Sequence, residues 1–128
     1  MTDPDAIAAA EKVIGPVLAK TMQEQINEGT PLGDVGKLAA ELVFRDVWGR
    51  PGLDNHSRAL ATLGVLIGKK RMPILRYYAR IAMRQGVTEE QLGEVALQAI
   101  PYAGFPTAVA AAQIMREVAK EVAAERAG

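Results

Sequence analysis

The chain has 128 residues, 15 basic and 15 acidic side chains, and no cysteine. A length of this order fits one domain, residues 1–128, and the missing cysteine excludes disulfides, thiolate metal sites and cysteine redox chemistry. A net charge of zero gives no reason to expect a nucleic-acid or membrane partner. Without a signal peptide or an apolar run of roughly 18 residues, the chain is expected to be cytoplasmic.

Apolar residues recur with helical spacing along almost the whole chain, which predicts an all-α fold of five to six helices. Asp3 followed by Pro4 is typical of a helix start, and Gly29 is the expected end of this first helix. A second helix is expected over residues 34–48, followed by a loop over residues 49–55.

The third expected helix, residues 56–68, is apolar on nearly all sides and is therefore predicted to be buried. The basic residues 69–71 interrupt the pattern, and Pro73 opens a fourth helix that Gly86 ends. Thr88 and Gln91 have the spacing of a capping box for the fifth helix. Its expected apolar stripe consists of Leu92, Val95, Ala96 and Ala99. Residues 104–106 should end that helix and start the last one.

Several short motifs occur in a fixed order: FRDVWGRPGLDNHSR from Phe44, GVTEEQL from Gly86, and YAGFP from Tyr102. This order resembles the carboxymuconolactone decarboxylase family over roughly half of the chain. The resemblance implies a compact helical bundle of the alkylhydroperoxidase D type. It also implies decarboxylation of a small carboxylated lactone in aromatic-compound breakdown, with no metal and no organic cofactor. A homo-oligomer, a trimer or a hexamer, is the implied assembly.

The sequence departs from the related peroxidases at their reactive positions. Their two cysteines would fall at Arg71 and Ile74, their glutamate at Ala59 and their histidine at Tyr78. A thiol peroxidase needs a thiolate, so that activity is excluded. The decarboxylases also keep a histidine where this chain has Tyr78, which leaves two hypotheses open. The chain is a decarboxylase, or it is a diverged member that acts on another small molecule or binds a ligand without turnover.

Loss of CO2 from a carboxylated lactone requires a proton donor and stabilisation of an oxyanion. The candidate catalytic residues are His56, Tyr78 and Glu94. His56 is the only histidine, and histidine is the side chain best suited to proton transfer at neutral pH. Each candidate also has a structural interpretation: His56 at a helix start, Tyr78 as a core tyrosine with a satisfied hydroxyl, and Glu94 as an ion-pair partner.

The candidate substrate-binding residues are Arg58, Tyr102, Phe105 and Thr107. Arg58 lies in an apolar helix, so its guanidinium needs a carboxylate from Asp54, Glu94 or a substrate. Phe105 and Thr107 begin the last helix, where free amides at positions 107 and 108 favour an anion, either a ligand or a neighbouring side chain.

Six cations and no acid occur between residues 69 and 84, including Arg76, Arg80 and Arg84 at intervals of four. A solvated face or an ion-pair surface between subunits is favoured over a nucleic-acid patch, because exposed aromatic residues are scarce and the flanking segments are acidic.

Overall fold

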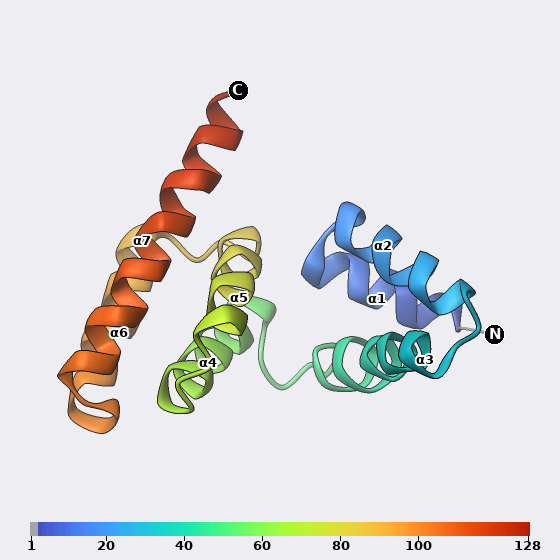
Figure 1. The fold of residues 1–128 in the computed structure, drawn as a ribbon, viewed down its shortest axis with the longest axis horizontal. Coiled ribbons are helices and arrows are strands. Elements are labelled where there is room, and N and C mark those ends of the chain that lie inside the picture. Colours follow the sequence, from blue (N-terminus) through green and yellow to red (C-terminus); the bar gives the residue numbers. More distant parts are fainter. Residues whose placement is uncertain (1–2) are drawn as a thin grey trace. The chain divides into compact units, whose positions relative to one another are not determined.

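The computed structural model describes residues 3–128, which form seven α-helices and one π-helical segment and no strand (Figure 1). The helices are α1 (Pro4–Ile14), α2 (Pro16–Asn27), α3 (Pro31–Leu38), η1 (Ala39–Val47), α4 (Asn55–Gly68), α5 (Met72–Arg84), α6 (Glu89–Ala103) and α7 (Phe105–Ala127). The predicted all-α class is confirmed, with more helices than the five to six expected. Contacts divide the chain into a first unit that ends at Asn55 and a second unit that starts at His56. A single domain stays a prediction.

The first helix is shorter than predicted, because a glycine and a proline divide residues 4–29 into α1 and α2. Gly15 has φ 91°, a conformation that other residues avoid, and Pro16 occupies the first turn of α2. A proline inside one continuous helix would remove a hydrogen bond and clash with the preceding turn. The start was predicted correctly: Asp3 caps α1, and its Oδ1 accepts a hydrogen bond from the Asp5 amide at 2.9 Å.

The second predicted helix also differs, because it begins at Pro31 and changes to π geometry at Ala39. The Thr30 hydroxyl caps α3 by accepting a hydrogen bond from the Gly33 amide at 3.1 Å. The wider spacing of η1 continues to its end, where the Trp48 amide donates to the Val43 carbonyl, five residues back, at 2.9 Å. A π-helix of this length is rare.

In the first unit α1 packs against α2 and η1, and α3 packs against α2 and η1. Completely buried Ala6, Ala10 and Ala40 allow α1 and η1 to approach closely. Arg45 of η1 strengthens this contact, since its Nη1 donates to Asp3 Oδ2, at the cap of α1, at 2.6 Å. Within η1, the Nε of Arg45 donates to Asp46 Oδ1 at 2.8 Å. The hydrogen bond from Arg45 holds the pKa of the Asp46 carboxyl below its ordinary value.

In the second unit α7 packs along both α5 and α6 (Figure 1). The largest completely buried side chains of this unit are Leu63, Ile67, Leu75, Ile81, Leu92, Met115 and Val118. The prediction that the third helix is buried on nearly all sides is wrong. α4 buries only one face, Ala59, Leu63 and Ile67, and Val65 on another face is 59% exposed.

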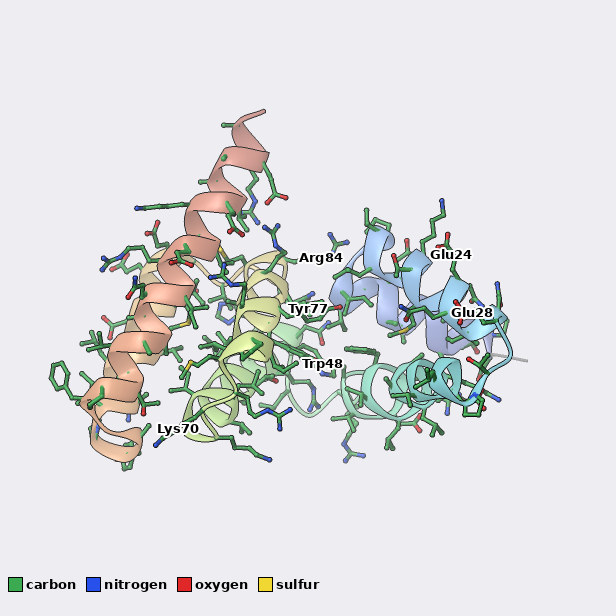
Figure 2. All side chains as sticks on the ribbon, viewed as in Figure 1. Glu24, Glu28, Trp48, Lys70, Tyr77 and Arg84 are labelled. Carbon is green, nitrogen blue, oxygen red and sulfur yellow. The ribbon has the colours of Figure 1, made fainter. Side chains whose placement is uncertain are left out.

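The predicted helix ends of the second unit are largely confirmed. The capping box is complete: the Gln91 amide donates to Thr88 Oγ1 at 3.1 Å, and the Thr88 amide donates to Gln91 Oε1 at 3.0 Å. Gly104, with φ 92°, ends α6 and precedes α7. Lys70, labelled in Figure 2, turns the chain between α4 and α5 with a positive φ of 57°.

The basic stripe of α5 pairs with α7 of the same chain. Arg76 binds Glu117 and Glu121, and Arg80 binds Glu121 at 3.1 Å and Glu125 at 2.6 Å. These ion pairs of Arg76 and Arg80 lie within one chain, on a solvated face where the two side chains are 43% and 41% exposed. The stripe joins two helices of the second unit. Among the described residues, no helix combines the length and apolar character needed to cross a membrane.

Candidate functional site

The structure holds His56 at the start of α4 by a hydrogen bond to α6. Its Nε2 lies 3.1 Å from Oε1 of Gln91. An amide oxygen only accepts, so Nε2 donates the proton and Nδ1 is the ring nitrogen left to exchange a proton with a ligand. Gln91 is itself fixed, because the same Oε1 accepts from the Thr88 amide in the capping box. The sequence therefore positions its only histidine through the cap of another helix.

Glu94 lies on the same side of α6 as Gln91, three residues further along the helix. Its side chain is exposed. The structure thus places His56 in the first turn of α4 and Glu94 in the second turn of α6.

An apolar groove of about 430 Å³ runs between α4 and α6. From α4 it is lined by Leu60, Ala61, Gly64 and Gly68, and from α6 by Val95, Gln98, Ala99, Tyr102 and Ala103. Leu60 and Val95 come one helical turn after His56 and Gln91, so the hydrogen-bonded pair lies at the head of the groove. Tyr102, a predicted substrate-binding residue, lies near the other end and is 81% exposed.

Arg58 follows His56 by two residues, which places it about 200° around α4 from His56. It is half-buried and does not line the groove. Its Nε is buried without a hydrogen-bond acceptor, although the residue makes other polar or electrostatic contacts. Arg58 is therefore close to the head of the groove along the helix axis but faces a different side of α4.

Tyr78 is separate from the groove. It lies half-buried on α5 and packs edge to face against Tyr77, with 5.7 Å between the ring centroids. Burial, and secondarily the neighbouring Tyr77, raise the pKa of the Tyr78 phenol above its ordinary value. A phenol with a raised pKa is a weaker acid at neutral pH, which makes Tyr78 a poorer proton donor than a histidine.

The two candidates at the start of α7 do not line the groove either. Phe105 is 64% exposed and Thr107 is half-buried. The amide of Ala108, predicted to be free for an anion, donates to the Gly104 carbonyl at 3.1 Å. The prediction of two free amides at this helix start is therefore wrong at Ala108.

Sequence reasoning missed the role of Gln91 beyond its helix cap, and it missed the groove residues Gly64 and Gly68. The spacing of His56, Leu60, Gly64 and Gly68 at intervals of four places them along one side of a helix, and this signal could have identified the groove. Within residues 3–128, no three acidic or histidine side chains gather closely enough to hold a metal ion.

A helical bundle with a histidine at the head of an apolar groove is typical of a small-molecule site. Residues 33–117 match the sequence profile of the Carboxymuconolactone decarboxylase family. The chain therefore belongs to that family.

Two similar proteins are decarboxylases by name. The first is 4-carboxymuconolactone decarboxylase from Acinetobacter baylyi, 36% identical over 89 residues, which are 70% of this chain and 66% of that protein. The match thus spans slightly less than two thirds of the Acinetobacter protein. The second is nitrosuccinic acid decarboxylase npaB from Metarhizium robertsii, 34% identical over 108 residues, which are 84% of this chain and 73% of that protein.

Proposed function

We propose that this protein decarboxylates a small carboxylated substrate, with His56 as the proton donor. The observation that carries the proposal is the His56–Gln91 pair at the head of the α4–α6 groove, in a chain whose similar proteins are named as decarboxylases. A carboxylated lactone of aromatic-compound breakdown is the substrate that the family suggests. No cofactor is part of the proposal, because the substrate's own carbonyl can accept the electron pair.

The reaction places specific demands on the head of the groove. The bond between the carboxyl carbon and the substrate breaks, CO2 leaves, and the electron pair spreads onto the adjacent carbonyl oxygen. A proton then returns to the carbon, and Nδ1 of protonated His56 supplies it. The N-terminal end of α4 favours the carboxylate before it leaves. Solvent returns the proton to His56, and Glu94, on the neighbouring helix, orients the substrate or acts as a base.

The proposal is tested by incubating the purified full-length protein with a panel of carboxylated butenolides and other small acids, and measuring released CO2 together with the loss of substrate by NMR. At least one acid should lose CO2 faster than in buffer, and the His56→Ala protein should serve as the control. If no acid on the panel reacts, the proposed activity is wrong for these substrates.

Tyr78, in place of the family's histidine, favours a second candidate: a member that binds a small molecule without turnover. The same panel separates the two functions. Binding by several acids without any CO2 release would support the ligand-binding function.

We also infer that the protein is a homo-oligomer, a trimer or a hexamer, as the family implies. Large apolar side chains are exposed in both units: Leu32, Val35, Leu38 and Leu42 in the first, and Val65, Leu97 and Val109 in the second. An obligate interface would cover roughly 800 Å² or more per partner. Light scattering at micromolar concentration should give a multiple of the 13.7 kDa chain mass, whereas a monomeric mass would contradict this inference. A cytoplasmic location stays a prediction.

A further inference from the structure

We propose that the α4–α6 groove binds an uncharged apolar group of the substrate, so that the protein selects acids with an apolar ring or chain beside the carboxylate. This inference rests on the proposed function for the place of the carboxylate, at the head of the groove. The walls of the groove determine what chemistry the rest of the substrate must have.

The chemistry of the groove walls excludes a substrate with a second charged group at its other end. None of the nine lining residues carries a charge, and the only polar side chains are the amide of Gln98 and the phenol of Tyr102. A carboxylate placed among these walls would lose its hydration without gaining a cation. An aliphatic chain or an aromatic ring would instead exchange water for apolar contacts with residues such as Leu60 and Val95.

The size of the groove fits a small molecule. Its volume of about 430 Å³ falls within the roughly 300–1,000 Å³ of small-molecule sites.

Two glycines keep the groove open, although the fold does not require them. A Cβ added at Gly64 or Gly68 would meet no atom within 4 Å, and neither residue has a positive φ. Glycine inside a helix is less stable than alanine, so local stability would favour a side chain at Gly64. The missing side chains leave space beside Leu60 and below the His56–Gln91 pair, which is where the body of a bound acid would lie.

The test compares two acids that share a carboxylate and differ in their apolar end, butanoate and 4-phenylbutanoate. Dissociation constants are measured by NMR titration of the full-length protein. Burial of the phenyl ring should make 4-phenylbutanoate bind about 10- to 100-fold more tightly than butanoate. The Gly64→Leu protein should lose this difference and keep its affinity for butanoate.

Gly93→Leu is the matched control. Gly93 is also a helical glycine whose added Cβ would meet no atom within 4 Å, but it lies on α6 outside the groove. The Gly93→Leu protein should preserve the preference for 4-phenylbutanoate over butanoate. Gly64→Ala, which adds one methyl group, provides a milder variant if Gly64→Leu does not fold, and it should weaken 4-phenylbutanoate more than butanoate.

Equal affinity of the wild-type protein for the two acids, or an unchanged preference in folded Gly64→Leu, would overturn the inference. A change of oligomeric mass in Gly64→Leu with unchanged affinity for both acids would also overturn it, because the groove would then be a contact between copies. Binding needs no turnover, so the two proposals fail separately. A preference for the phenyl acid without any CO2 release would contradict only the proposed decarboxylase function. CO2 release without the preference would contradict only the proposal that the groove binds an apolar group.

Discussion

Replacing His56 by alanine is expected to lower the decarboxylation rate by about 10²–10⁴-fold, the usual contribution of a positioned acid or base. The imidazole is held by Gln91 at the head of the groove, with Nδ1 left for the substrate. Replacing Tyr78 by phenylalanine should change the rate little. That variant removes only the hydroxyl, and the burial that raises the pKa of this phenol makes it a weak acid at neutral pH.

The comparison is made with a confirmed substrate, and kcat is measured separately from KM, because a proton donor acts mainly on kcat. Circular dichroism establishes that both variants are folded. Loss of activity in Tyr78→Phe with an active His56→Ala would transfer the role of donor to the phenol. Full activity in both variants would place the reaction away from the head of the groove.

The parts of the fold that the sequence predicted well depend on interactions between residues that are close together in the chain. Asp3 caps α1, Thr88 and Gln91 cap α6, and Gly104 separates α6 from α7. Each of these signals is complete within one helical turn. Apolar periodicity alone was misleading across Gly15 and Pro16, since the apolar pattern continues on both sides of the break between α1 and α2.

The arrangement of side chains from different helices could not be read from local patterns. His56 and Gln91 are 35 residues apart, and their hydrogen bond depends on how α4 and α6 align. The partners of Arg80, Glu121 and Glu125, lie 41 and 45 residues away on α7. Residue type indicated His56 as a candidate, but the groove beside it arises from side chains that are small or missing on two helices.

Gly33 illustrates the opposite role of a glycine, where close packing between two helices requires it. A Cβ at Gly33 would lie 2.3 Å from the Gln25 carbonyl oxygen and 3.1 Å from its carbon. Both are backbone atoms of α2, so α2 and α3 would have to separate. Gly36, one turn later on α3, has room for a methyl group, since its Cβ would make ordinary van der Waals contact with side-chain atoms of Met22 and Ile26 at 3.8 Å.

Gly33→Ala is therefore expected to lower the free energy of unfolding by about 3 kcal/mol, the upper part of the range for overpacked sites. Gly36→Ala should raise it by about 0.5–1 kcal/mol, because alanine is the better helix former. Chemical denaturation followed by the fluorescence of Trp48, the only tryptophan and part of the first unit, measures both variants. Equal stability of the two alanine variants would mean that α2 and α3 do not approach as closely at Gly33 as the structure indicates. A loss confined to Gly33→Ala would identify this contact as the reason for the glycine.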